Sequence, residues 1–106
     1  MKGSQSMPTR VFSEPKLGAT ARFSRTITEA DVSLFIGVTW DVNPYHTDEN
    51  FLQQTNIKGR IVPGLLTASM LTHLGGLWGF LADRMDLIFV APVYIGETIT
   101  AECQIV

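Results

Sequence analysis

The residues best suited to acid–base chemistry are an aspartate and a histidine five positions apart, Asp41 and His46. Asn43 and Pro44 lie between them, and Pro44 fixes its own φ and pushes Asn43 away from helical geometry. The stretch therefore predicts a rigid turn and not the interior of a helix. Such a turn can aim a carboxylate and an imidazole at one volume, where they could hold a water molecule and move its protons. The same spacing is also typical of a plain surface turn.

The composition indicates one small globular domain. The chain has 106 residues, of which 45% are hydrophobic and 17% charged, and its net charge of −2 argues against nucleic acid or an anionic membrane as partner. No apolar run reaches membrane-spanning length. Cys103 is the single cysteine, which excludes an intrachain disulfide and a cysteine-based zinc site. We therefore expect a cytoplasmic protein without a metal site.

The domain is expected to begin near residue 19. Residues 1–18 contain two prolines and end at Gly18, so they predict an irregular lead-in. They lack the apolar core of a signal peptide, so secretion is not expected. Residues 19–106 are expected to form a single domain.

The first elements that must position Asp41 and His46 are a strand and a helix. Residues 20–26 alternate weakly and predict the strand. Thr28 and Asp31 form a variant of the capping box, which predicts a helix from there to about Val38. After His46, Thr47 is expected to cap a second short helix.

A long helix is predicted from Pro63 to about Leu81. The chain is apolar on nearly every side there, which predicts a helix buried all round. The pair Gly75 and Gly76 predicts a kink or an end of this helix. His73, on the same helix, is expected to be a core or interface residue and not a ligand.

Two strands are predicted to follow. Residues 86–91 predict a buried strand that ends at Pro92. Residues 98–106 alternate, so that Ile99, Ala101 and Cys103 face inward and Cys103 packs without acting as a nucleophile. The predicted fold class is α+β, with an antiparallel sheet wrapped around one long buried helix.

Three blocks of the sequence resemble one enzyme family. Residues 41–46 read D-x-N-P-x-H, residues 59–69 read G-R-I-V-x-G-x-L-x-A-S, and residues 92–102 read P-V-Y-I-G-E-T-I-T-A-E. In this order and spacing they resemble the MaoC-like, (R)-specific enoyl-CoA hydratases, which have the hot-dog fold. The resemblance covers about residues 17–106.

The resemblance implies a role for each matching residue. Asp41 and His46 match the pair that activates water for syn addition to a trans-2-enoyl thioester, which gives a (3R)-hydroxyacyl thioester. Gly64 matches the glycine whose backbone N–H holds the thioester oxygen, as a donor near a helix start can do. The residues implied in substrate binding are Asn43, Trp40, Pro63 and Ser69.

The chain departs from the family pattern in three respects. The family usually has histidine at the position of Pro63, and a small or polar residue at that of Trp40, which could narrow the acyl tunnel or simply pack. The stretch from Gly79 to Asp86 is shorter than usual. The C-terminal strands of the family are expected to be missing, so the domain is predicted to be a truncated hot-dog domain.

Two classes of function remain open. The first is a hydro-lyase, an enoyl-CoA hydratase or MaoC-like dehydratase, with coenzyme A as part of the substrate and no separate cofactor. The alternative is a non-catalytic role: either a catalytically impaired hot-dog domain that binds an acyl thioester or serves in assembly, or a binding module for another acyl-carrying partner, such as acyl carrier protein. In both, the resemblance implies a homodimer or a larger homo-oligomer, with no nucleic acid and no membrane as partner.

Overall fold

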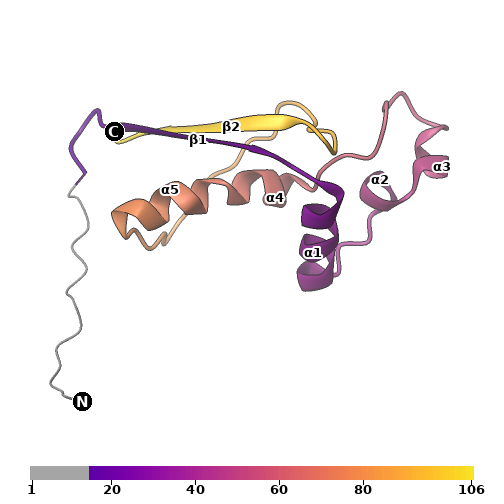
Figure 1. Ribbon diagram of the computed structural model, residues 1–106, viewed down its shortest axis with the longest axis horizontal. Helices are drawn as coiled ribbons and strands as arrows, with labels where there is room; N and C mark the ends of the chain where they lie inside the picture. The colour runs from indigo at the N-terminus through magenta and orange to yellow at the C-terminus, as the bar shows by residue number, and fades with distance from the viewer. Residues whose placement is uncertain (1–14) are drawn as a thin grey trace, which may run out of the picture.

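The computed structural model describes residues 15–106 and contains a two-stranded antiparallel sheet with the helices of residues 64–78 beneath it (Figure 1). The two strands pair from Thr20 opposite Gln104 to Thr26 opposite Thr98. The elements in chain order are β1 (Thr20–Thr26), α1 (Glu29–Thr39), α2 (Pro44–Thr47), α3 (Glu49–Leu52), α4 (Gly64–Ser69), α5 (Leu71–Trp78) and β2 (Thr98–Gln104).

Alternation of side chains gives the sheet one polar face and one apolar face. On the polar face, the hydroxyls of Ser24 and Thr100 lie 2.7 Å apart, and a second hydroxyl pair joins Thr26 to Thr98. On the other face, Phe23 packs against the core with alternate residues of β2. The predicted strand at 20–26 and the predicted inward face of 98–106 are therefore confirmed.

The predicted capping box at the start of α1 is also confirmed. The backbone N–H of Asp31 donates to the Thr28 hydroxyl at 3.2 Å, and the Asp31 carboxylate accepts the Thr28 N–H at 2.8 Å. The helix ends at Thr39, after which Trp40 adopts a left-handed conformation with φ of 58°. A left-handed conformation costs a non-glycine residue about 1–2 kcal/mol, and here it turns the chain sharply toward Asp41.

The core lies where the end of β1, the helix α1 and the helix α4 meet. Ile27, Val32, Val62 and Met70 form a buried cluster there. Ile27 is the first residue after β1, so the chain passes directly from the sheet into this cluster. The partly buried residues packed against the cluster are Phe23, Ile36, Leu66, Val93, Ile95, Ile99 and Ala101.

The prediction of one long buried helix is wrong. The helix is interrupted at Met70, where N–H groups bond to carbonyls three residues back and tighten the chain. The sheet covers one side only, so Leu65 remains 59% exposed. The Gly75–Gly76 pair lies inside α5, which ends instead at Gly79 with a φ of 71°. Within residues 15–106, no helix has both the length and the apolar character to cross a membrane.

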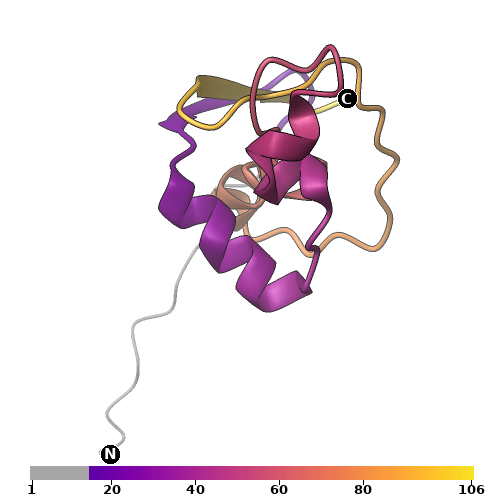
Figure 2. The ribbon, with the colours of Figure 1, turned by 90° about the vertical axis from the view of Figure 1, so that its right-hand side faces the viewer.

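Two further predictions about local structure are wrong. Residues 86–91 form no strand, and Ile88 and Val90 are 87% and 89% exposed. An apolar run becomes a strand only beside a partner strand, and this segment runs as a coil outside the helices (Figure 2). The cap of the short helix α3 is Asp48 and not Thr47, because the Asp48 carboxylate accepts the Phe51 N–H at 3.1 Å.

The predicted lead-in lies largely outside the described residues. Its last part, residues 15–18, has no helix or strand, and Gly18 takes a φ of 83° before β1 begins. The boundary at residue 19 stays a prediction.

The capping box makes stability depend on pH. The Thr28 backbone N–H, followed by the Thr28 hydroxyl and the nearby Arg25, holds the pKa of Asp31 below its usual value of 3.8. The charge therefore stabilises the fold fully above about pH 4, and this contribution is lost as the pH falls through the lowered pKa. We expect Asp31→Asn to lower the unfolding free energy by about 0.5–1 kcal/mol at pH 7.

Urea unfolding of the parent and of Asp31→Asn at several pH values measures this difference. It should be constant above about pH 4 and should shrink below it. The control is Asp86→Asn, which removes a highly exposed carboxylate paired with Arg84 and should change little. A difference for Asp31→Asn that grows as the pH falls would contradict the assignment.

Candidate functional site

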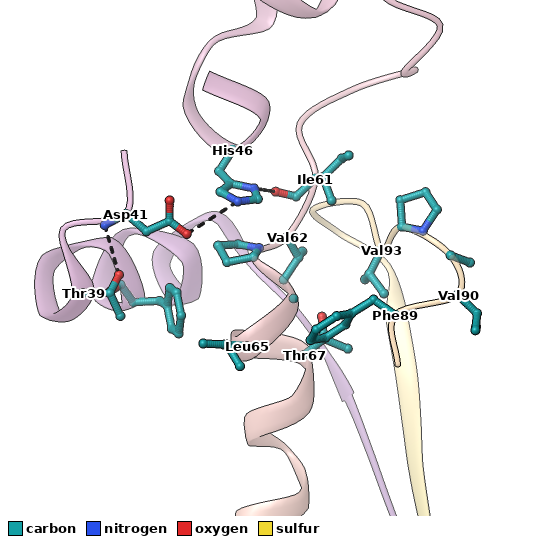
Figure 3. Close-up of a pocket in the computed structure, with 15 residues that line it drawn as sticks. Thr39, Asp41, His46, Ile61, Val62, Leu65, Thr67, Phe89, Val90 and Val93 are labelled. Carbon is teal, nitrogen blue, oxygen red and sulfur yellow. Dashed lines mark hydrogen bonds and ion pairs between the residues drawn. The ribbon is translucent and has the colours of Figure 1, made fainter. Parts of the chain in front are cut away.

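A pocket of about 690 Å³ opens between the end of α1, the helix α2, the start of α4 and residues 89–93 (Figure 3). Four of the residues that line it carry polar side chains, and the others are apolar or glycine. An apolar cavity with a few convergent polar groups is typical of a small-molecule site. The polar lining residues are Thr39, Asp41, His46 and Thr67.

The structure brings Asp41 and His46 together in this pocket. The imidazole Nε2 lies 3.7 Å from the Asp41 Oδ2, which is too long for a direct hydrogen bond. The two atoms can instead both form hydrogen bonds to one small molecule that lies beside them in the pocket. The sequence prediction that the stretch aims both side chains at one volume is confirmed.

The prediction that this stretch is not helical is wrong in part. Asn43 has an extended ψ of 128°, as expected before proline, but Pro44 then begins the one-turn helix α2, which carries His46. The Asn43 side chain accepts the Tyr45 N–H at 3.0 Å and so caps this turn. A proline at the first helical position is compatible with a helix, which the sequence argument overlooked.

The main chain of Ile61 sets the protonation of the His46 ring. Nδ1 lies 2.7 Å from the Ile61 carbonyl oxygen (Figure 3). A carbonyl oxygen can only accept, so Nδ1 must carry the hydrogen. In the neutral ring, Nε2 then has a free lone pair, and it is this nitrogen that lies on the side of Asp41. His46 is therefore oriented as a base.

Asp41 is positioned by the end of α1. Its backbone N–H donates to the Thr39 hydroxyl at 3.2 Å, and that hydroxyl donates to the Phe35 carbonyl at 2.9 Å. The Asn43 N–H donates to the Asp41 carboxylate at 3.3 Å. The left-handed turn at Trp40 and these bonds hold the carboxylate at the pocket while its second oxygen faces His46.

Gly64 begins α4 at the pocket wall. The N–H groups of Leu66 and Thr67 both bond to the Pro63 carbonyl, whereas no backbone acceptor within residues 15–106 pairs with the Gly64 N–H. That donor is one of the free groups that every helix start provides. A side chain at this position would place its Cβ 2.9 Å from the ring of Phe89. Glycine therefore allows the close approach of that ring.

The other predicted site residues divide into two groups. Pro63 lines the pocket and is fully buried. Asn43, Trp40 and Ser69 do not line it. Trp40 is 83% exposed, and the Ser69 hydroxyl bonds to the Leu66 carbonyl on the helix itself. Trp40 therefore does not narrow this pocket, and Asn43 shapes the site through the backbone.

Sequence reasoning missed several residues of the site. Thr39 gave a usable signal, because a threonine two positions before Asp41 can bond to its backbone. Thr67 was hidden in an apolar helix, and Phe89 was assigned to a buried strand. The Ile61 carbonyl gave no signal, because a main-chain group is independent of residue type. Within residues 15–106, no cluster of three or more histidine, cysteine, aspartate or glutamate side chains could hold a metal ion.

Comparison with known proteins agrees with this geometry. The profile of the MaoC like domain family matches residues 12–106. The chain belongs to this family. It is 38% identical to an (R)-specific enoyl-CoA hydratase of Rhodospirillum rubrum over 94 residues, covering 85% of this chain and 65% of that protein. It is 33% identical to the (R)-specific enoyl-CoA hydratase of Aeromonas caviae, covering 85% of this chain and 70% of that protein.

Solved structures confirm the fold class. The chain superposes on the (R)-hydratase of A. caviae with a TM-score of 0.75 at 32% identity, covering 84% of this chain and 70% of that one. The unliganded R-hydratase of Pseudomonas aeruginosa gives a TM-score of 0.73 at 28% identity, covering 82% of this chain and 59% of that one. The predicted α+β hot-dog fold is therefore confirmed for this member of the MaoC-like family.

The contact between His46 and Ile61 leads to a spectroscopic prediction. We expect neutral His46 to carry its proton on Nδ1, because that nitrogen donates to a carbonyl. Nitrogen-15 chemical shifts of the imidazole distinguish the two tautomers. The exposed His73, which stacks on Phe23, serves as the internal comparison. A neutral His46 ring protonated on Nε2 would contradict this orientation.

Proposed function

We propose that this MaoC-like domain is a hydro-lyase of the (R)-specific enoyl-CoA hydratase type, which adds water to a trans-2-enoyl thioester. The observation that carries the proposal is the pair of Asp41 and His46, 3.7 Å apart at the pocket, with Nε2 free to accept a proton. The relatives named as hydratases support the same reaction. The expected product is a (3R)-hydroxyacyl thioester.

The reaction needs a base and an acid on one side of the substrate. In the proposed mechanism, His46 Nε2 removes a proton from the water as its oxygen attacks the β-carbon. Asp41 delivers a proton to the α-carbon. Return of the proton from His46 to Asp41 then restores both groups. Because both groups lie on the same side of the pocket, the addition is syn.

The thioester oxygen becomes negative during this addition. In the proposal, the Gly64 N–H bonds to that oxygen, since this donor lies at the pocket and no backbone acceptor of the described chain pairs with it. A fixed donor aimed at a developing charge stabilises the transition state. The acyl chain would lie against the apolar wall, which includes Val62, Leu65 and Val93. No separate cofactor is included, because water and the acyl thioester supply every atom of the product.

A second candidate function is binding without turnover. The observation that favours it is the exposure of residues 86–91, which leaves one wall of the pocket outside the sheet. A domain with a loosely held wall could retain an acyl thioester or take part in assembly without aligning it for reaction. Binding of an acyl-CoA without hydration would distinguish this function from catalysis.

The proposal also includes a homodimer in the cytoplasm. The single cysteine supports a reducing compartment. Large apolar side chains are exposed on α5 and on the segment that follows it, more than a monomer usually leaves in contact with water. A second copy of the chain is the occupant we propose for this surface. The exposed residues of this chain that we assign to the surface are Leu77, Phe80, Leu81, Met85, Leu87, Ile88 and Val90.

The hydration of crotonyl-CoA tests the proposal. We expect Asp41→Asn and His46→Ala each to lower the rate by about a hundredfold or more, because each removes one member of the acid–base pair. The loss of absorbance of the conjugated thioester measures the reaction. His73→Ala is the control, since this second histidine lies outside the pocket. Parent-like hydration by both site variants would refute the proposal, and thermal unfolding would show whether the variants remain folded.

Two substitutions at one position isolate the Gly64 N–H. Gly64→Pro and Gly64→Ala both place a carbon against the Phe89 ring, but only proline removes the N–H. Proline is compatible with the first position of α4, and the preceding ψ of 133° suits it. We expect Gly64→Pro to hydrate crotonyl-CoA about a hundred- to a thousandfold more slowly than Gly64→Ala, as for the loss of one oxyanion donor. Equal rates for the two variants would exclude this role.

A further inference from the structure

The hydroxyl of Thr67 is a buried polar group without a partner. Within the described chain, its Oγ1 is the one buried side-chain oxygen or nitrogen with no hydrogen bond. Such a group has lost its bonds to water without replacing them, which costs free energy and calls for an explanation. Thr67 also lines the pocket, where Figure 3 shows it on α4.

Other helical threonines of this chain bond to a nearby carbonyl. The Thr72 hydroxyl donates to the Ser69 carbonyl at 2.7 Å, and the Thr39 hydroxyl donates to that of Phe35 at 2.9 Å. At these two spacings, Thr67 could bond to the Gly64 carbonyl, with which it forms no hydrogen bond, or to the Pro63 carbonyl, which already accepts two N–H groups, at 2.9 and 3.2 Å. A carbonyl oxygen has two lone pairs, so both are in use. The helix therefore leaves the Thr67 hydroxyl free for another acceptor.

The position of Thr67 indicates what that acceptor is. It follows Gly64 by three residues on α4, so both lie on the same face of the helix at the pocket. Asp41 and His46 are committed to the water, and the Thr39 hydroxyl is already bonded. Thr67 is thus the one polar side chain of the lining that is left to contact the substrate. A rotation about χ1, which has two common states for threonine in a helix, brings the hydroxyl to a ligand without backbone movement.

We propose that the Thr67 hydroxyl is a second donor to the thioester carbonyl oxygen of the substrate, beside the Gly64 N–H. This inference rests on the proposed hydratase function and adds a substrate-contacting side chain to it. Two donors from one helix face hold the developing negative charge and fix the orientation of the thioester. The Thr67 hydroxyl, which has no partner within the described chain, then gains an acceptor when the substrate binds.

Three variants test the proposal. Thr67→Val replaces the hydroxyl with a methyl group of similar shape, and Thr67→Ser keeps the hydroxyl. We expect Thr67→Val to lower kcat/KM for crotonyl-CoA by about tenfold or more, and Thr67→Ser to stay within about threefold of the parent. Thr72→Val is the matched control, because that hydroxyl lies outside the pocket. A parent-like kcat/KM for Thr67→Val would overturn the proposal.

The thermal stability of the ligand-free protein distinguishes a substrate contact from a structural hydrogen bond, because the two roles predict opposite effects of Thr67→Val. Replacing an unpartnered buried hydroxyl with a methyl group should leave the midpoint of thermal unfolding unchanged or higher. A clear decrease for Thr67→Val would instead reveal a structural hydrogen bond and overturn the proposal.

Binding of butyryl-CoA, which has no double bond to hydrate, separates this inference from the proposed function. If the parent binds it but does not hydrate crotonyl-CoA, the hydratase function fails, and weaker binding by Thr67→Val than by Thr67→Ser still supports the contact. If the parent hydrates crotonyl-CoA and Thr67→Val does so equally well, only the Thr67 contact fails. If the parent neither binds nor hydrates, both fail.

Discussion

The backbone of residues 60–62 holds the two halves of the pocket together. The Ile61 N–H donates to the Tyr45 carbonyl at 2.9 Å, which fixes this segment to α2. The next N–H, that of Val62, donates to the Val93 carbonyl at 2.7 Å on the opposite wall. Between these bonds, the Ile61 carbonyl accepts the His46 ring. One short extended segment therefore fixes His46, the opposite wall of the pocket and the chain that enters α4.

The same segment is tied to the helix that leads to Asp41. An ion pair joins Arg60 to Glu29, in the first turn of α1. Asp41 follows the other end of α1, and Val62 is buried in the core cluster beside Val32 of that helix. Asp41 and His46 come from separate elements, yet both are positioned relative to residues 60–62. A rigid common support of this kind is what the proposed catalytic role of the pair requires.

Local patterns in the sequence predicted the parts of this structure that local physics decides. The capping box at Thr28 and the alternation around Cys103 depend on neighbours in the chain, and both appear in the structure. The spacing of the D-x-N-P-x-H stretch left a plain surface turn open, and it was the resemblance to the MaoC-like family that favoured a site there; the structure places both side chains at the pocket. The helical turn of this stretch was missed, because proline disfavours helix before itself and tolerates helix after itself.

The remaining errors concern what covers an apolar surface. Residues 64–78 and 86–91 have the composition of buried elements. Composition does not show, however, which chain packs over these apolar residues. In this structure Leu65 and Ile88 are exposed, and Met70 interrupts the helix. The Thr67 hydroxyl could not be evaluated either, because its lack of a partner depends on two other bonds to the Pro63 carbonyl. Such features depend on how distant parts of the chain pack in three dimensions.

The pairing of β1 with β2 affects how the chain can fold while it is being synthesised. The hydroxyl pair of Thr26 and Thr98 joins residues 72 positions apart, so the ribosome releases β1 long before its partner strand exists. The self-capped α1 can form early, but Phe23 and Ile27 remain without the sheet that shelters them. Closing so long a loop is a slow step. Until residues 98–104 have been synthesised, these apolar side chains are therefore exposed, and exposed apolar surface of this kind favours aggregation.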